Sequence, residues 1–113
     1  MSQITTHVLD TTRGKPAPQL PISLYAQIDN GWELLASGVT NEDGRIAGLL
    51  DEQVKLPAGV YRMHFQTSAY FNANNEAGFY PYVDIVFELD DSGAHYHIPL
   101  LLTAFGYSTY RGS

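Results

Sequence analysis

Alternation of apolar and polar residues is the feature that most limits how this chain can fold. Ile22, Leu24 and Ala26, for example, recur at every second position. Successive side chains of a strand point to opposite faces of a sheet, so a repeat of two residues predicts strands with one buried face. Short candidate strands of this kind occupy residues 4–9, 21–28, 32–38, 45–47, 59–66, 84–89, 95–102 and 106–110.

Turn-forming residues separate these runs. The sequence Asp-Asn-Gly at 29–31 is typical of a tight hairpin, and Asn-Glu-Asp-Gly at 41–44 forms a second turn. Residues 67–75 lack alternation and predict one short helix, with Thr67 or Ser68 as its N-cap. Seven or eight short strands at this spacing predict an all-β fold, an antiparallel β-sandwich. A chain of 113 residues without a linker is expected to form a single domain, residues 1–113.

The composition narrows the class of partner. The formal net charge is −6 with only six Lys and Arg residues, which argues against nucleic acid, because that partner requires a basic surface. Cysteine is absent, which excludes disulfides, thiol nucleophiles and thiolate metal sites. Only 16% of residues are charged, so another subunit is expected to cover part of the surface. Neither a membrane-spanning run nor a secretory leader is evident, so we expect a cytoplasmic protein without membrane contact.

One candidate strand, residues 95–102, has two faces of different character. One face is uniformly apolar and belongs to the core, whereas the other is half polar and half apolar. A mixed face suits neither bulk water nor a dry core, so we expect it to line an interface or a binding cleft. His7 has the same outward position on the first strand, opposite the core-facing Thr6 and Val8. The apolar face consists of Tyr96, Ile98, Leu100 and Leu102, and the mixed face of His95, His97, Pro99 and Leu101.

The histidines allow more than one interpretation. His95 and His97 point the same way and could bind a metal if His7 or His64 supplied a third ligand. The favoured alternative makes His95 a surface residue beside a glycine turn, gives His97 a functional role and leaves His64 solvated. Arg45 follows the second turn and, by composition alone, would be a solvated turn residue.

The end of the chain gathers several functional groups. An aromatic, strand-like run leads into Tyr-Arg-Gly-Ser at positions 110–113, so this segment is expected to be held in place. Tyr110 and Ser108 share one face at a spacing of two, and Phe105 and Tyr107 are expected in the core. The final serine has no nucleophile-elbow sequence around it, so a triad role is not expected. The glycines match no phosphate-binding loop, so we expect no cofactor.

Five motifs together resemble the transthyretin-like family. They extend over essentially the whole chain, and the closing Tyr-Arg-Gly-Ser is the most specific of them. The chain is similar to the 5-hydroxyisourate hydrolases of this family and not to its hormone carriers, which have other residues at the charged and imidazole positions and extend past this end. The motifs are residues 6–10 (THVLD), 14–17 (GKPA), 40–45 (TNEDGR), 95–101 (HYHIPLL) and 107–113 (YSTYRGS).

The resemblance implies a fold, an assembly and a site. The implied fold is a transthyretin-like antiparallel β-sandwich of about eight strands with one short helix. The implied assembly is a homotetramer, a dimer of dimers, with its sites in a central channel. His7, Arg45 and His97 match the catalytic trio of the family, and no metal is part of the site. The positions implied to contact substrate are His7, Arg45, Ser108, Tyr110, Arg111 and Ser113.

The activity implied by the resemblance is hydrolysis of 5-hydroxyisourate to 2-oxo-4-hydroxy-4-carboxy-5-ureidoimidazoline in urate degradation. His7 or His97 would activate water, because histidine titrates near neutral pH, and the other would orient the substrate or protonate the leaving nitrogen. Arg45 is permanently charged and suits oxyanion binding. Two other classes stay open: a non-catalytic carrier of small ligands on the same sandwich, and an immunoglobulin-like adhesion module.

Overall fold

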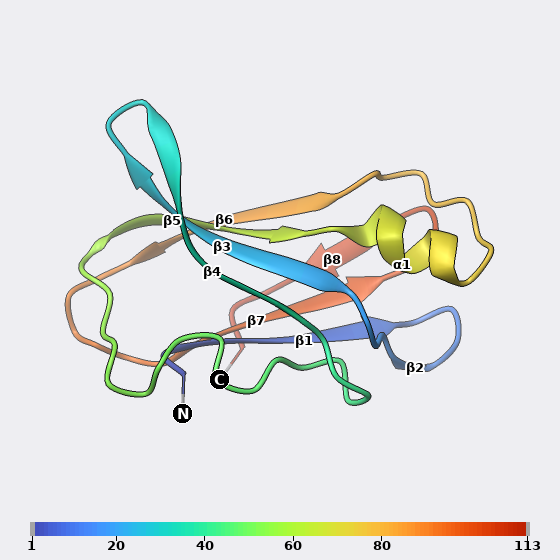
Figure 1. Cartoon of the computed structure of the whole chain (residues 1–113), viewed down its shortest axis with the longest axis horizontal. Helices are drawn as coiled ribbons and strands as arrows, with labels where there is room; N and C mark the ends of the chain where they lie inside the picture. Colours follow the sequence, from blue (N-terminus) through green and yellow to red (C-terminus); the bar gives the residue numbers. More distant parts are fainter. Residues whose placement is uncertain (1, 113) are drawn as a thin grey trace.

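Two four-stranded sheets lie face to face in the computed structural model, which describes residues 2–112 (Figure 1). Within this range, eight strands and one short helix confirm the predicted all-β sandwich. The elements in chain order are β1 (Ile4–Asp10), β2 (Lys15–Pro16), β3 (Pro21–Ile28), β4 (Gly31–Val39), β5 (Gly59–Phe65), α1 (Thr67–Ala73), β6 (Val83–Leu89), β7 (Tyr96–Leu102) and β8 (Tyr107–Thr109).

The first sheet has the strand order β2-β1-β7-β8. β1 and β7 run parallel, with Thr5 opposite His97 and His7 opposite Pro99. This pair departs from the fully antiparallel sandwich that the sequence predicts, whereas the other strand pairs of residues 2–112 are antiparallel. The whole second sheet separates β1 from β7 in the chain, and a connection of that length lets the chain return in the same direction.

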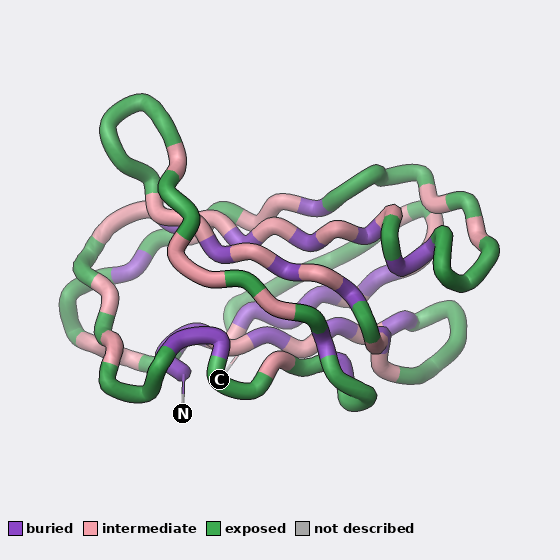
Figure 2. The backbone as a smooth tube through the Cα atoms, viewed as in Figure 1, coloured by how far each residue is buried: buried purple, intermediate pink, exposed green. Residues whose placement is uncertain are grey.

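The second sheet has the strand order β4-β3-β5-β6. β3 and β4 form the predicted hairpin, and Asp29 in its turn has a φ of 47°, a left-handed conformation that Asp tolerates. The tip of this hairpin projects beyond the body of the sandwich and is exposed (Figures 1 and 2). The rest of the sheet covers the inner face of the first sheet and closes the core.

The core lies between the two sheets, and buried segments recur along the strands that face it (Figure 2). Tyr61, Met63 and Phe65 of β5 are buried, as the alternation predicts. Each large apolar side chain removed from water contributes about 1.5–3 kcal/mol, which is why the apolar face of each strand turns inward. The apolar face assigned on β7 is confirmed by the burial of Tyr96, Ile98, Leu100 and Leu102.

Residues 45–47 do not form the strand that the sequence predicts. The backbone around them folds into a turn, in which Asn41 N–H donates to the carbonyl of Arg45 at 2.8 Å. The side-chain oxygen of Asn41 accepts from the N–H groups of Asp43 and Arg45. Because these groups are satisfied locally, they are not available to a sheet.

Two further predictions about the edges of the fold are wrong. Neither Thr67 nor Ser68 caps α1: the N-cap position is Gln66, which makes no side-chain capping bond, and the Thr67 hydroxyl donates to the carbonyl of Tyr80 instead. Phe105 and Tyr107 are not in the core, since they are 78% and 43% exposed. β8 is the edge strand of its sheet, and there the Tyr107 ring packs edge-on against Tyr80, with their centroids 5.2 Å apart, and not within the core.

Within residues 2–112, no helix has the length and apolar character needed to span a membrane.

Candidate active site

The outer face of the first sheet carries the predicted histidines. His7 on β1 and His97 on β7 are half-buried, between neighbours that are buried in the core. β1 and β7 are adjacent strands, so the two rings share one surface although 90 residues separate them in the chain. This arrangement confirms the outward position that alternation predicts for both side chains.

Arg45 reaches this face from the loop that joins β4 to β5. Its Nη2 atom lies 3.2 Å from Nδ1 of His7. Arginine offers only hydrogen-bond donors, so Nδ1 of His7 must accept and a neutral His7 carries its proton on Nε2. Arg45 therefore holds His7 in one tautomer and is not the solvated turn residue that composition alone favours.

Gly44 lets the loop approach β1 closely. Val8 N–H donates to the carbonyl of Gly44 at 2.8 Å, and Gly44 itself has a φ of 74°. A Cβ at this position would overlap the carbonyl oxygen of Val8, so no other residue fits without displacing the loop. Arg45 follows directly, and its own N–H is held by the side chain of Asn41 at 3.1 Å.

A cleft of about 420 Å³ lies on this face. Arg45, His95 and His97 contribute polar groups to its wall, and Ile46 contributes an apolar surface. A volume of this order accommodates a small molecule. The mixed face of β7 therefore lines a cleft, as the sequence predicts.

Burial and positive charge keep both histidines neutral. Burial lowers the pKa of His97, the charge of Arg45 lowers it further, and the neighbouring His7 and His95 rings add smaller decreases. Burial also lowers the pKa of His7, Arg45 adds to the decrease, and Asp43 opposes it. Both values lie below the ordinary 6.5, so both rings are mainly uncharged at neutral pH. A neutral imidazole can accept a proton from water.

Thr5 is a residue of this site that the sequence did not single out. Its hydroxyl oxygen lies 2.9 Å from Nδ1 of His97 and 2.9 Å from Nε2 of His95. The signal was present in the sequence, because Thr5 stands two positions before His7 and so shares its face. Its partners could not be predicted without the parallel pairing of β1 and β7.

The C-terminal tail is held against β7, as the sequence predicts. Gly112 N–H donates to the carbonyl of His97 at 2.8 Å, and the two residues form an isolated bridge. β8 pairs in the same register, with Ser108 opposite Leu101. Alternation from this register puts Ser108 and Tyr110 on the outer face with His97.

Arg111 lies on the opposite side of the tail. Its guanidinium carbon is 4.4 Å from the centroid of the Tyr96 ring, and Tyr96 belongs to the core face of β7. The structure therefore does not bring the Arg111 side chain to the outer face with Ser108 and Tyr110. Ser113 lies outside the described residues.

The remaining histidine belongs to a different surface. His64 lies on β5 in the second sheet, where Nδ1 is 2.6 Å from a carboxylate oxygen of Asp84 and Nε2 is 3.1 Å from the side-chain oxygen of Gln66. The ring of His64 is therefore half-buried and hydrogen-bonded, and the prediction that it is solvated is wrong. Across the described range, no cluster of three or more His, Cys, Asp or Glu side chains has a geometry that could hold a metal ion.

The chain is similar to known proteins in both sequence and structure. Residues 4–112 match the HIUase/Transthyretin family. The 5-hydroxyisourate hydrolase of Halalkalibacterium halodurans is 45% identical over 118 residues, which cover 98% of each chain. The structure of sea bream transthyretin in complex with thyroxine matches with a TM-score of 0.91 at 34% identity, over 98% of this chain and 95% of that one. Klebsiella pneumoniae 5-hydroxyisourate hydrolase matches with a TM-score of 0.85 at 38% identity, over 97% of this chain and 98% of that one. With such matches along nearly its whole length, the chain belongs to the HIUase/Transthyretin family.

Proposed function

We propose that this chain is a 5-hydroxyisourate hydrolase, which converts 5-hydroxyisourate to 2-oxo-4-hydroxy-4-carboxy-5-ureidoimidazoline. The observation that carries the proposal is the contact of Arg45 with His7, 3.2 Å long, on the same sheet face as the cleft that His97 lines. The names of the Halalkalibacterium relative and the Klebsiella structure support it, and these proteins match nearly the whole chain.

His97 acts as the general base in this mechanism. Its lowered pKa leaves it neutral at neutral pH, so it takes a proton from water while the water oxygen bonds to the ring carbonyl carbon of the substrate. When the carbon–nitrogen bond breaks, His97 returns the proton to the leaving nitrogen. A positioned base of this kind contributes about 10²–10⁴-fold to the rate.

His7 and Arg45 bind the substrate and do not exchange protons with it. Because Arg45 occupies Nδ1 of His7, the Nε2–H group of His7 is a donor for a substrate carbonyl. Most of the N–H donors of Arg45 remain for the oxygen that becomes negative during attack. One positioned donor contributes about 10²–10³-fold, which suits a substrate that already decays unaided.

The tail completes the site in this proposal. Ser108 and Tyr110 contact the substrate from the outer face, and Ser113 contributes its carboxylate. Arg111 acts indirectly, by anchoring the tail on the ring of Tyr96. The absence of a metal and of any cofactor, and a cytoplasmic location, stay predictions.

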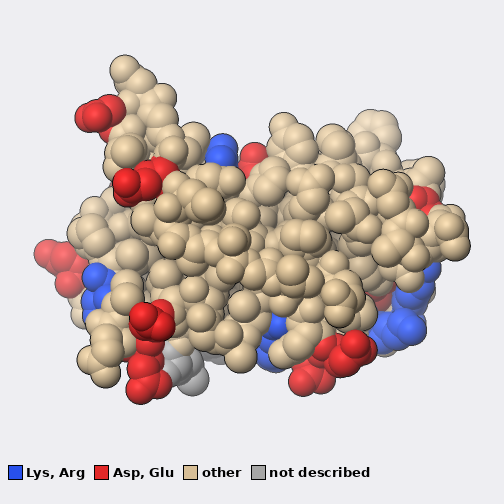
Figure 3. All heavy atoms as spheres, viewed as in Figure 1, with Lys and Arg blue, Asp and Glu red and all other residues tan. Residues whose placement is uncertain are grey.

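We also propose that the protein is a homotetramer, a dimer of dimers, with the sites in a central channel. Large apolar side chains such as Phe79 and Phe105 are 70% and 78% exposed in the single chain, which favours a covering subunit. Charged side chains lie mostly around the edge of the face seen in Figure 3, whose centre is uncharged. Uncharged surface of this kind is typical of subunit interfaces.

Freshly generated 5-hydroxyisourate tests the activity. We expect the protein to accelerate the loss of ultraviolet absorbance and to yield an optically active product. A carrier of small ligands or an adhesion module would do neither, so decay at the rate seen in buffer alone would contradict the proposed function.

Substitution of the three site residues tests their roles. His7→Ala, Arg45→Ala and His97→Ala should each lower kcat/KM by about 10²-fold or more. The fold should survive, because all three side chains point away from the core. His64→Ala is the matched control: it removes a half-buried histidine from the other sheet and should keep nearly wild-type activity. An equal loss in folded His64→Ala and His97→Ala would contradict the site.

A further inference from the structure

Thr5 stands between two histidine rings on the outer face of the first sheet. Its hydroxyl oxygen is 2.9 Å from Nδ1 of His97 and 2.9 Å from Nε2 of His95, and both are hydrogen-bond distances. We call the hydrogen-bonded series His95–Thr5–His97 the threonine bridge. The parallel register places Thr5 directly opposite His97, so this bridge follows from the strand pairing itself.

A single hydroxyl hydrogen couples the two rings. Thr5 donates to one of the two nitrogens and accepts from the other. If His97 donates from Nδ1, Thr5 donates to Nε2 of His95, and Nε2 of His97 keeps its lone pair. If His95 donates from Nε2, Thr5 donates to Nδ1 of His97, and a neutral His97 carries its proton on Nε2. Only the first arrangement leaves Nε2 of His97 able to take a proton from water.

We propose that Thr5 and His95 are positioning residues that hold neutral His97 in the tautomer protonated on Nδ1, with Nε2 free to act as the base. This inference rests on the proposed hydrolase function and adds two residues that act through His97. Within residues 2–112, Nε2 of His97 makes no hydrogen bond, whereas Nδ1 is bound by Thr5.

The tail keeps the His97 ring turned toward Thr5. Gly112 donates its N–H to the carbonyl of His97, and a Cβ on Gly112 would lie only 2.6 Å from Cδ2 of that ring. Cδ2 and Nδ1 lie on opposite edges of an imidazole. Packing of the Cδ2 edge against Gly112 therefore directs Nδ1 to the hydroxyl of Thr5.

His95 is exposed to solvent, and its Nε2 atom is the partner that the proposal needs. A neutral His95 that carries its proton on Nδ1 accepts the Thr5 hydrogen on Nε2, which leaves the Thr5 oxygen to accept from the Nδ1–H group of His97. The other charged or titratable groups around His95, Thr5 and His97 in residues 2–112 include His7 from β1, Arg45 from the 40–58 loop, Glu88 from β6, Tyr96 from β7, and Tyr110 and Arg111 from the tail.

Nitrogen-15 NMR of the substrate-free protein measures the tautomer of His97 directly. Above neutral pH we expect Nδ1 to be protonated and Nε2 to be free. Thr5→Val removes the hydroxyl while keeping the branched shape, and should move His97 toward the Nε2–H tautomer. Thr5→Ser keeps the hydroxyl and should keep the wild-type signals. A wild-type His97 protonated on Nε2, or an unchanged Nδ1–H tautomer in folded Thr5→Val, would overturn the proposal.

The same spectra test the part of His95. His95→Ala removes the acceptor of the Thr5 hydrogen, so His97 should move toward the Nε2–H tautomer in this variant. An unchanged Nδ1–H tautomer in folded His95→Ala would remove His95 from the proposal.

Kinetics separate this proposal from the function on which it rests. Thr5→Val should lower kcat by about 10-fold or more with little change in KM, because it impairs a base worth about 10²–10⁴-fold, and Thr5→Ser should recover most of kcat. Wild-type hydrolysis with an unchanged kcat in Thr5→Val would overturn the bridge alone. A wild-type protein that does not hydrolyse 5-hydroxyisourate would overturn the hydrolase function, and with it the catalytic meaning of the bridge.

Discussion

At the scale of single residues, Gly112 packs directly against the ring of His97. A Cβ on Gly112 would lie 2.6 Å from Cδ2 of His97, closer than nonbonded carbon atoms approach. Gly112→Ala should therefore displace either the ring or the tail. The expected result is a decrease in kcat of about 10-fold or more, within the range for a general base. Steady-state kinetics measure the change, and circular dichroism establishes that the variant is folded.

Gly31→Ala is the matched control for this substitution. Gly31 begins β4 and is exposed, and a Cβ there would have no atom within 4 Å. The same added methyl group should leave kcat unchanged at this position. If folded Gly112→Ala also kept the wild-type kcat, the contact between the tail and His97 would have no part in catalysis.

At the scale of elements, a hydrogen-bond network centred on the buried carboxylate of Asp10 fastens α1 to the end of β1. The Tyr70 hydroxyl donates to a carboxylate oxygen of Asp10 at 2.7 Å, and Arg13 donates to the same oxygen at 2.8 Å. Burial raises the pKa of Asp10, but the hydrogen bonds from Tyr70 and Arg13 outweigh it and lower the pKa overall. Burial and the bond to Asp10 raise the pKa of Tyr70 to about 12. The hydroxyl therefore stays protonated and remains a donor.

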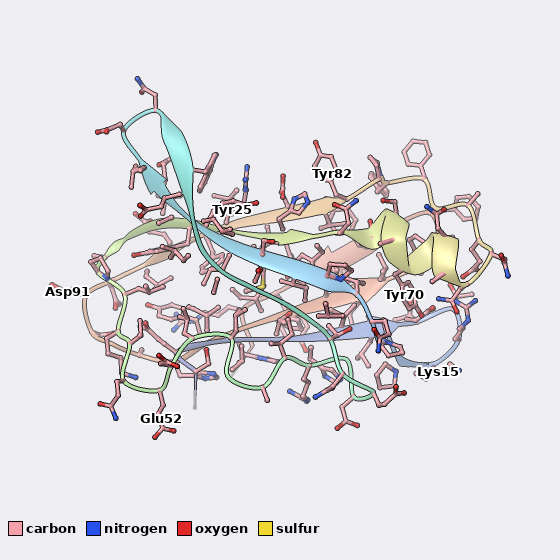
Figure 4. All side chains as sticks on the ribbon, viewed as in Figure 1. Lys15, Tyr25, Glu52, Tyr70, Tyr82 and Asp91 are labelled. Carbon is pink, nitrogen blue, oxygen red and sulfur yellow. The ribbon has the colours of Figure 1, made fainter. Side chains whose placement is uncertain are left out.

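Tyr70→Phe should weaken this attachment. A hydrogen bond to a charged group contributes about 1.5–3 kcal/mol, so the free energy of unfolding should decrease by that amount. Urea unfolding followed by circular dichroism measures it. Tyr82→Phe is the control, because Tyr82 is 49% exposed and points away from the sandwich in Figure 4, whereas Tyr70 belongs to α1 and is buried. Equal losses in the two variants would mean that the bond to Asp10 adds nothing.

At the scale of the whole molecule, His7, His97 and Asp10 are among the groups that link stability to pH. The pKa values of His7 and His97 are below 6.5 in the folded chain, so the unfolded chain takes up protons first as the pH falls. The contribution of neutral His7 and His97 to the free energy of unfolding is fully present above pH 6.5. It is lost as the pH falls through their lowered pKa values. The stabilisation from Asp10 is present above pH 3.8 and is lost as the pH falls through its own lowered pKa.

Urea unfolding midpoints should therefore decrease in two separate stages between about pH 7.5 and about pH 3. Replacing both His7 and His97 by Gln should remove the upper stage and leave the lower one. An upper stage of unchanged size in that variant would assign it to other groups.

The assembly is the other property of the whole molecule that can be measured. Light scattering at micromolar concentration should give a mass four times that of the 12.5 kDa chain. The physical reason is the exposure of large apolar side chains such as Phe105, which are costly in water. A mass equal to one chain would contradict the proposed tetramer, and with it the central channel between its subunits.

Much of the fold could be predicted because strand faces depend on local alternation. Tyr61, Met63 and Phe65 are buried as predicted, and the outward positions of His7 and His97 follow from the same rule. The strand predicted at 45–47 was wrong, because side-chain and backbone bonds around a turn compete with a sheet in a way that alternation does not reveal.

The sequence by itself determined which side chains face the core and which face outward, since a period of two depends only on neighbouring residues. It also marked His7, Arg45 and His97 as candidates. Only the tertiary structure decided their partners: the parallel pairing of β1 with β7 puts Thr5 opposite His97, and the left-handed Gly44 brings Arg45 to His7. These contacts join segments far apart in the chain, and such pairings depend on the packing of the whole sandwich and not on any local pattern.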